Sequence, residues 1–257
     1  GSNLADNETI VIDTTAPAAP SNAIDLSDGS DTGALNTDSI TNDTTPTLRV
    51  DLTGTNAVAG DTVELLLGGS ALSTPVTKVL DSTDISNTYV DLTVTDTDLG
   101  ADGDKVFTAR VTDAAGNIGT AGGELTITLD TAAPTAAVTS TTEDGAYKAG
   151  DDVNITVTFN EAVTLGGTSP TLSAVLETGT TDQTIALTTA DSGLTWTGTY
   201  TVQAGDTSSD LTVNTLVLGG TNPTLTDAAG NAATLTIAGG SNLADNETIV
   251  IDTTAPA

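Results

Sequence analysis

The sequence contains no cysteine, methionine or histidine. The absence of cysteine and histidine excludes Cys/His nucleophilic pairs, histidine general bases and zinc sites built on imidazole or thiolate ligands. Oxygen atoms are therefore the only abundant metal ligands in the chain. A cysteine-free chain rich in Asp, Thr, Gly and Ser also suits a bacterial protein that is secreted and folds outside the cell.

Basic residues are also scarce, because only five Lys and Arg stand against 35 Asp and Glu, which gives a formal net charge of −30. This balance argues against a nucleic-acid partner or an anionic membrane surface, and makes cations the natural partner. Repulsion should keep separate chains apart at low salt, so we expect a monomer. No signal peptide or long apolar segment occurs, and we expect no direct membrane insertion.

Aromatic side chains are few, since the chain has one Trp, three Tyr and two Phe. The core should be lean, and folding should depend on cations that neutralise the carboxylates. We expect Trp196 and Phe107 to be core residues rather than ligand platforms. Paired carboxylates could serve a glycosidase, but that chemistry needs an apolar or aromatic cleft to shift a pKa and hold a sugar. We therefore expect no enzymatic activity.

An internal repeat is the most informative feature of what is present. Residues 1–18 reappear letter for letter as residues 240–257, which is typical of a tandem array. A shorter period is marked by Asp13, Asp130 and Asp252, each followed by Thr, a variable residue, Ala and Pro. Thr-Asp-Ala-Ala-Gly-Asn also occurs twice, at Thr112–Asn117 and Thr226–Asn231. Two domains of ordinary size are expected.

The repeats predict four segments. Residues 1–13 should be an orphan closing strand and linker of a preceding repeat, either loose or docked on the sheet edge of another molecule. Residues 14–130 should form domain 1, residues 131–252 domain 2, and residues 253–257 the start of the next linker.

Short runs of alternating apolar residues dominate both domains, and Gly, Asp and Asn separate them. No segment has a sustained helical period. The predicted strands are 47–52, 62–67, 89–94, 105–111, 124–129, 153–159, 171–176, 183–188, 194–202, 211–218, 232–237 and 247–251. About seven strands in each domain are typical of an immunoglobulin-like sandwich, although another Greek-key or jelly-roll sandwich stays open. The expected fold class is all-β, with two tandem immunoglobulin-like β-sandwich domains in an elongated array.

Sandwich connectivity predicts where the carboxylates gather. At the pole where the chain enters domain 1, the linker residue Asp13 should meet the loop that holds Asp113 and Asn117, and Glu8 could reach the same ion. At the junction between the domains we expect a larger set of oxygen ligands: Asp25, Asp28, Asp31, Asp98, Asp102, Asp104, Asp130, Asn160, Glu161, Asp227 and Asn231. Asp252 should begin the next such junction.

Calcium fits this set best, because it takes six to eight oxygen ligands in flexible geometry, whereas magnesium needs stricter geometry and fewer protein ligands. Each motif also has a simpler interpretation. Any single aspartate of these loops can stabilise a turn, and Asp113 and Asn117 can do so through side-chain hydrogen bonds. The convergence of separate segments, and its recurrence at both periods, favours metal.

Two stretches resemble a known family. Asp25-x-x-Asp-Gly-Ser-Asp-Thr-Gly, then Ser39-Ile-Thr-Asn-Asp-Thr-Thr-Pro, Thr112-Asp-Ala-Ala-Gly-Asn and Asp130-Thr-Ala-Ala-Pro resemble the bacterial immunoglobulin-like (BIg) extender repeats of large type I-secreted RTX adhesins. Tyr147-Lys-Ala-Gly-Asp-Asp-Val and the following run to Val163 are similar to a second subtype. The glycine-aspartate nonapeptides of RTX secretion regions are absent from the sequence.

The resemblance implies a calcium-rigidified spacer on the surface of a Gram-negative cell, which projects a distal binding domain for adhesion or biofilm formation. Its implied partners are calcium ions and the neighbouring repeats of the same chain. It implies calcium ligands at the linker residues Asp13 and Asp130 and in the Asp113/Asn117 and Asp227/Asn231 loops. The alternative is an adhesin module that itself binds glycan, ice or a host protein. That function would require an exposed aromatic cluster or a flat threonine array, and neither stands out.

Overall fold

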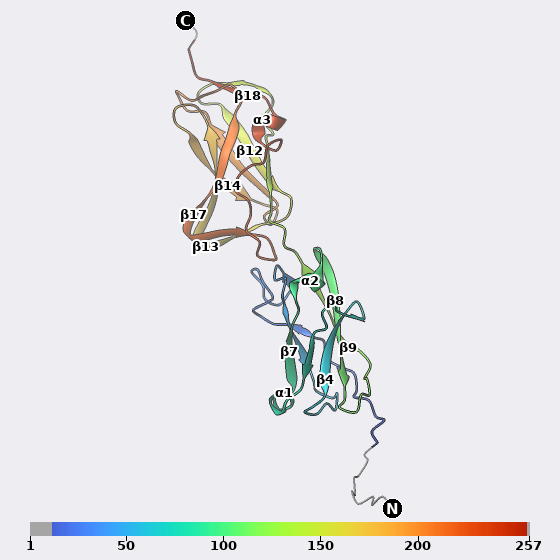
Figure 1. The fold of residues 1–257 in the computed structure, drawn as a ribbon. Helices are drawn as coiled ribbons and strands as arrows, with labels where there is room; N and C mark the ends of the chain where they lie inside the picture. Colours follow the sequence, from blue (N-terminus) through green and yellow to red (C-terminus); the bar gives the residue numbers. More distant parts are fainter. Residues whose placement is uncertain (1–11, 256–257) are drawn as a thin grey trace, which may run out of the picture. The chain divides into compact units, whose positions relative to one another are not determined.

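The computed structural model describes residues 12–255, which divide into two units (Figure 1). Within the described residues, unit 1 comprises 12–32 and 36–130, and unit 2 comprises 33–35 and 131–255. The regular secondary structure of each unit is mainly β-strand, and each unit has its own hydrophobic core. The expected all-β fold class with two sandwich domains is confirmed.

Unit 1 has two sheets. The first is antiparallel and has the order β1 (Asp25–Leu26), β3 (Thr47–Asp51), β7 (Tyr89–Thr93). The second has the order β2 (Ile40–Thr41), β9 (Gly122–Leu129), β8 (Gly103–Thr112), β4 (Thr62–Leu67), β5 (Ser70–Ala71), and β6 (Thr77–Val79) also pairs with β4. Its pairs are antiparallel except β2 with β9.

The core of unit 1 follows from the period-two alternation of these strands, since alternate side chains point to the same face of a sheet. Leu48 and Val50 of β3 face the core from one sheet, and Val63 of β4 and Phe107 of β8 face it from the other; all four are completely buried. Phe107 is therefore a core residue, as expected.

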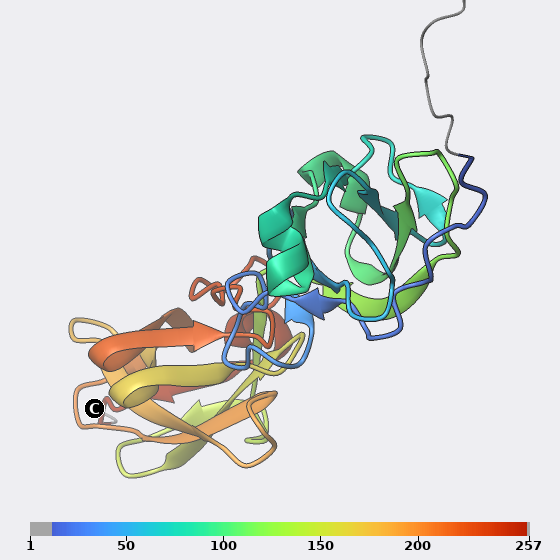
Figure 2. The ribbon, with the colours of Figure 1, turned by 90° about the horizontal axis from the view of Figure 1, so that it is seen from below.

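Unit 2 has a six-stranded sheet and a three-stranded sheet. The larger has the order β10 (Ala136–Thr139), β12 (Asp152–Phe159), β15 (Thr195–Thr201), β14 (Gln183–Thr189), β13 (Thr164–Glu177), β17 (Thr212–Thr226). The smaller has β18 (Ile249–Asp252) between β11 (Gly145–Tyr147) and β16 (Thr207–Ser208). Only two residue pairs join β14 to β15, fewer than join any other neighbouring strands of this sheet; Figure 2 shows the ribbon from below.

The core of unit 2 is built in the same way. Val153 and Ile155 of β12 and Leu172 of β13 are completely buried, and Trp196 and Tyr200 of β15 are 5% and 1% exposed. Trp196 belongs to this core, as expected, and its indole nitrogen donates a hydrogen bond to the Gly193 carbonyl at 2.9 Å.

The ends of β13 and β17 form a ribbon with internal symmetry. Leu-Gly-Gly-Thr-Ser-Pro-Thr-Leu at 165–172 lies antiparallel to Leu-Gly-Gly-Thr-Asn-Pro-Thr-Leu at 218–225. Gly167 and Gly220 occupy equivalent places, with φ of 108° and 107°. A Cβ atom on Gly167 would lie 2.6 Å from the carbonyl oxygen of Asn222, so only glycine permits this approach of the two strands.

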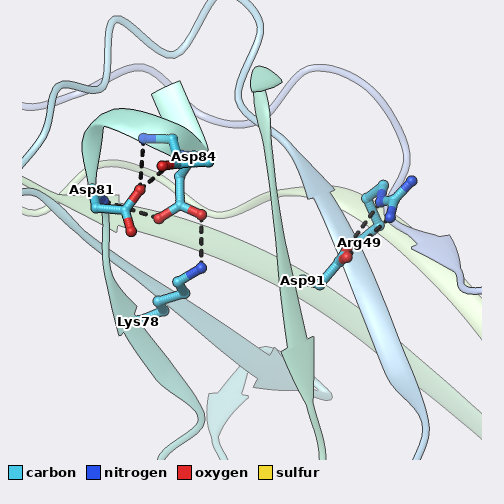
Figure 3. A network of polar contacts seen from close by, with 6 residues as sticks. Arg49, Lys78, Asp81, Asp84 and Asp91 are labelled. Carbon is cyan, nitrogen blue, oxygen red and sulfur yellow. Dashed lines mark hydrogen bonds and ion pairs between the residues drawn. The ribbon is translucent and has the colours of Figure 1, made fainter. Parts of the chain in front are cut away.

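Three short helices were not expected: α1 (Ser82–Asn87), α2 (Asp96–Leu99) and α3 (Leu243–Asn246). They are too short to show a 3.6-residue apolar period. α1 begins with a capping box, in which the Asp81 carboxylate accepts the Asp84 backbone N–H at 3.0 Å and the Asp84 carboxylate accepts that of Asp81 at 2.9 Å (Figure 3). None of the helices in residues 12–255 is long and apolar enough to cross a membrane.

The prediction of a strand at 232–237 is wrong. Within the described chain this segment makes only an isolated bridge, between Thr226 and Ala232. Leu235 and Ile237 pack against the core, and the Leu235 carbonyl accepts bonds from the Leu216 N–H at 3.0 Å and the Thr215 hydroxyl at 3.5 Å. The alternating pattern therefore reflects packing without a hydrogen-bonded ladder. An orphan strand was also expected in residues 1–13, of which residues 1–11 lie outside the described part of the chain.

Candidate metal centres

The loop Thr112–Asn117 in unit 1 is a tight turn after β8. The Asp113 carboxylate accepts hydrogen bonds from the backbone N–H and the side-chain amide of Asn117, both at 2.8 Å. The Asp113 N–H donates to the Asn117 carbonyl at 3.1 Å, which closes the loop. The bond from the Asn117 side chain lowers the pKa of Asp113, so this carboxylate is charged at neutral pH.

The second copy of this motif adopts the same turn in unit 2. The Asp227 carboxylate accepts the backbone N–H and the side-chain amide of Asn231, both at 2.9 Å. The Asp227 N–H donates to the Asn231 carbonyl at 3.2 Å. Asp227 is only 3% exposed. The turn interpretation therefore holds for both copies of the motif, and each turn also positions a carboxylate.

Asp13 lies beside the first of these loops. Its carbonyl oxygen accepts a bond from the Asn117 side-chain amide at 3.1 Å, and its carboxylate accepts the Thr15 N–H at 3.0 Å. The structure thus brings Asp13 and Asn117 together at the N-terminal pole of unit 1. Glu8, expected nearby, lies outside the described residues.

An acidic cavity of about 550 Å³ opens at this pole, lined by Asp13, Asp61, Asp113 and Asn56. Asp61 was not predicted from the sequence, and it is 3% exposed. Its carboxylate accepts the N–H groups of Val58 at 2.9 Å and Ala114 at 3.2 Å. The three carboxylates line one cavity, but among the described residues they do not form a group with oxygens within 4.8 Å of one another.

A closer pair of carboxylates lies within unit 2. Oxygens of Glu161 and Asp227 are within 4.8 Å of each other. Asn160 is adjacent, and its side-chain oxygen accepts the Thr135 N–H at 2.7 Å, while its amide donates to Glu161 at 3.5 Å. The amide oxygen of Asn160 is neutral, whereas Glu161 and Asp227 each offer a carboxylate, which makes these two the better ligands of this loop pair.

Asp31 in unit 1 is the most unusual carboxylate of the predicted set. It is 5% exposed, one oxygen accepts the Ser39 N–H at 3.2 Å, and the other has no hydrogen-bond partner. Burial, together with the neighbouring carboxylates of Asp38 and Asp25, raises the pKa of Asp31 above its ordinary value. A buried carboxylate oxygen of this kind needs a partner, which can be a proton, a bound cation or a hydrogen-bond donor. Asp25 in β1 and Asp28 after it are exposed.

Asp98, Asp102 and Asp104 are not gathered into one group of carboxylates in the described part of the chain. Asp98 in α2 accepts hydrogen bonds from the hydroxyls of Ser73 and Thr95, and these bonds lower its pKa. Asp104 in β8 accepts the Thr128 hydroxyl at 2.9 Å. Asp102 is exposed just before β8. Their assignment as ligands stays a prediction.

The linker residues Asp130 and Asp252 each lie at the end of the last strand of a unit. Asp130 follows β9 as the last residue of unit 1, and its N–H donates to the Thr41 carbonyl at 2.9 Å. Asp252 ends β18, and its carboxylate accepts the Thr254 N–H at 2.9 Å. The latter turn matches that of Asp13 with Thr15 in the identical sequence.

The basic residues do not neutralise these candidate ligands. Four of the five form ion pairs elsewhere: Arg49 with Asp91, Lys78 with Asp84, Arg110 with Glu64, and Lys148 with Asp151. Figure 3 shows the first two pairs, in which the Lys78 ammonium lies 2.7 Å from the capping carboxylate of Asp84. The fifth, Lys105, donates to the Ala101 carbonyl at 2.5 Å. The surplus negative charge is thus left for solution cations to balance.

Several solved structures are similar to this chain. Fibronectin(III)-like modules of CbhA from Clostridium thermocellum have 10% identity and a TM-score of 0.32, over 92% of this chain and 90% of that one. A tetra-tandem repeat in the extending region of a large adhesion protein has 18% identity and a TM-score of 0.31, over 88% of this chain and 50% of that one. The C-terminal domain of AspA, an antigen I/II-family protein of Streptococcus pyogenes, has 12% identity and a TM-score of 0.32, over 85% of this chain and 98% of that one.

No curated protein matches the sequence. A family model described as a bacterial Ig-like domain matches residues 18–131. This range covers the strands of the first unit, from β1 to β9, and ends just after Asp130. The family-model match therefore places a bacterial Ig-like domain at residues 18–131 of this chain.

Proposed function

We propose that this chain is a spacer of a bacterial cell-surface adhesin, and that calcium ions stiffen it. In this proposal the parent protein is an RTX adhesin, secreted by the type I route of a Gram-negative cell. The spacer holds a distal binding domain away from the cell for adhesion or biofilm formation. Two sandwiches in series, a family match to a bacterial Ig-like domain and an exact terminal repeat support it.

The pair Glu161 and Asp227 is the observation that carries the calcium part of the proposal. Two carboxylates whose oxygens lie within 4.8 Å of each other repel by roughly 3 kcal/mol at an effective dielectric constant of about 20. Burial of Asp227 strengthens this repulsion, and the five basic residues are engaged elsewhere. A divalent cation bound to both groups would turn the repulsion into attraction.

Calcium suits these groups better than magnesium, because it accepts carboxylates and backbone carbonyls in flexible arrangements. Carboxylates held by turns, such as Asp113 and Asp227, are already positioned for such a site. The linker residues Asp13, Asp130 and Asp252 are proposed as further ligands on the basis of their repeated sequence. With a dissociation constant of roughly 0.1–1 mM, ten times that calcium level adds about 1.4 kcal/mol per site to the free energy of unfolding.

Thermal unfolding in calcium and in chelator tests the metal site. The wild-type chain should gain stability in calcium, and Glu161→Gln, which leaves the Asp227 turn intact, should gain less. Asp182→Asn is the matched control, since Asp182 is exposed and its bond from the Asn214 amide at 2.9 Å can persist. Equal calcium-dependent gains in the wild type and Glu161→Gln would exclude this pair as ligands.

Small-angle X-ray scattering in calcium and in chelator tests the stiffening. Calcium should narrow the distribution of distances between the two units, because ions at the linker carboxylates restrict the linker. Identical scattering profiles in the two conditions would contradict a calcium-stiffened spacer, even if the thermal experiment shows that calcium binds.

A further inference from the structure

One isoleucine has opposite environments in the two copies of the terminal repeat. Ile251 in β18 is 2% exposed in the core of unit 2, whereas Ile12, its counterpart in the identical sequence, is 83% exposed. An exposed isoleucine forgoes the stabilisation of its buried twin. The residues around Ile12 therefore have the same sequence as a segment that is buried in unit 2.

The site in question is the position of residues 240–252 in unit 2, which we call the closing site. Three apolar side chains fill its core face: Leu243 and Ile249 are completely buried, and Ile251 nearly so. Their counterparts in the first copy are Leu4, Ile10 and Ile12.

The backbone of the closing segment is held on both sides. β18 runs parallel to β11 and antiparallel to β16. The Leu211 N–H donates to the Ile249 carbonyl at 2.7 Å, and the Ile249 N–H donates to the Asp210 carboxylate at 3.2 Å. Strand pairing on two edges gives the site a register that a matching segment must reproduce.

Polar side chains before β18 make the site specific for its sequence. The Asn242 side chain forms two bonds with the backbone of Val213, accepting at 3.0 Å and donating at 2.8 Å. The Asn246 amide donates to the Val138 carbonyl at 3.1 Å. The first copy carries the same asparagines, Asn3 and Asn7, at the same spacing.

We propose that the closing site of unit 2 binds residues 1–13 of a second copy of this chain whenever its own segment 240–252 is displaced or missing. Every residue that touches the site in the resident segment is present in the N-terminal copy, so the contacts can be reproduced one for one. Each chain offers one segment and one site, which makes the assembly head-to-tail and open. The interaction depends on strand pairing and apolar burial.

The resident segment should prevail in the intact chain. A tethered segment competes at an effective concentration of roughly millimolar, well above that of a second chain in dilute solution. The intact chain should thus be monomeric, and association should appear once the resident copy is removed.

Three versions of the chain test the proposal by sedimentation velocity. Deletion of residues 240–257 should give oligomers that grow with concentration, while the intact chain and a chain that lacks both residues 1–18 and 240–257 should stay monomeric. If the chain that lacks only residues 240–257 stays monomeric at all concentrations, binding to a second copy is overturned. This holds whether residues 1–13 then occupy the closing site of their own chain or bind nowhere.

A synthetic peptide of residues 1–18 tests the closing site directly on the doubly deleted chain. Trp196 is the only tryptophan and lies in the core of unit 2, so its emission reports occupation of the site or folding induced by the peptide. The peptide should bind in either case. Absence of binding would overturn the proposal.

Matched peptides test the register. Ile10→Thr changes the counterpart of buried Ile249 and should weaken binding at least about tenfold. Val11→Thr changes the counterpart of Val250, which is only partly buried, and should weaken binding less than about threefold. Equal affinities of the two peptides would show that the segment does not enter the closing site in the register of β18.

Discussion

The Tyr200 hydroxyl donates a hydrogen bond of 2.6 Å to the Asp206 carboxylate inside unit 2. The two residues are 1% and 6% exposed. Asp206 also accepts the Gln183 side-chain amide and the Gln203 N–H, both at 3.1 Å. The phenol therefore ties the turn before β16 to β15, with a charged acceptor that is almost entirely shielded from water.

Tyr200→Phe should lower the free energy of unfolding by about 1.5–3 kcal/mol, because it removes a bond to a charged group and leaves Asp206 with fewer donors. Urea unfolding followed by Trp196 fluorescence measures this loss. Tyr147→Phe is the control, since the Tyr147 hydroxyl donates to the Glu143 carbonyl in an exposed setting and its loss should cost less than about 1 kcal/mol. Equal losses in the two variants would contradict a special role for the buried pair.

Stability should also fall at high pH through Tyr200. Burial and the bond to Asp206 raise the pKa of Tyr200 well above its usual range. A raised pKa means that the fold favours the protonated phenol. The contribution is fully present below the unfolded pKa of about 10 and is lost as pH rises toward the folded pKa. Unfolding free energies measured from about pH 8 to about pH 11.5 should decline less steeply in Tyr200→Phe than in the wild type.

Two glycines with nearly the same φ allow a matched test of steric contact. Gly193 has φ of +98° and Gly205 has φ of +97°. A Cβ atom on Gly193 would lie 1.9 Å from the Val163 carbonyl oxygen, whereas one on Gly205 would meet nothing within 4 Å. Gly205→Ala should cost about 1–2 kcal/mol from backbone strain, and Gly193→Ala at least about 2 kcal/mol more. Comparable urea midpoints for the two variants would refute the clash.

The strands were predictable where alternation alone decides them. β3, β8 and β12 lie within two residues of their expected ranges, because one face of each strand is buried and the other is not. The extension of β17 to Thr226 was not predicted, since Gly-Gly and Pro normally mark turns. The end of β17 is a strand because it pairs with the copy of the same motif in β13. That pairing is a tertiary contact, which local sequence does not predict.

The candidate sites show a similar division. The repeated motif predicted the loops of Asp113 and Asp227, because their hydrogen bonds are local in sequence. Asp61 was missed, since one of its hydrogen-bond donors, the Ala114 N–H, is 53 residues away in the sequence. The unpartnered oxygen of Asp31 likewise depends on a fold that the sequence does not display, although the residue itself was in the predicted set.

The final prediction concerns this unpartnered oxygen. In chelator, Asp31→Asn should raise the free energy of unfolding of unit 1 by about 1 kcal/mol, because it removes a buried negative charge near Asp38 and keeps an acceptor for the Ser39 N–H. In calcium, the wild type should regain this difference, since a cation can occupy the place of the missing donor. Asp28→Asn, an exposed neighbour, should change stability by less than about 0.5 kcal/mol. Differential scanning calorimetry measures both transitions, and Trp196 fluorescence identifies that of unit 2. An Asp31→Asn chain that is less stable than the wild type in chelator would mean that the charge of Asp31 is stabilised within the fold, and that no cation is needed there.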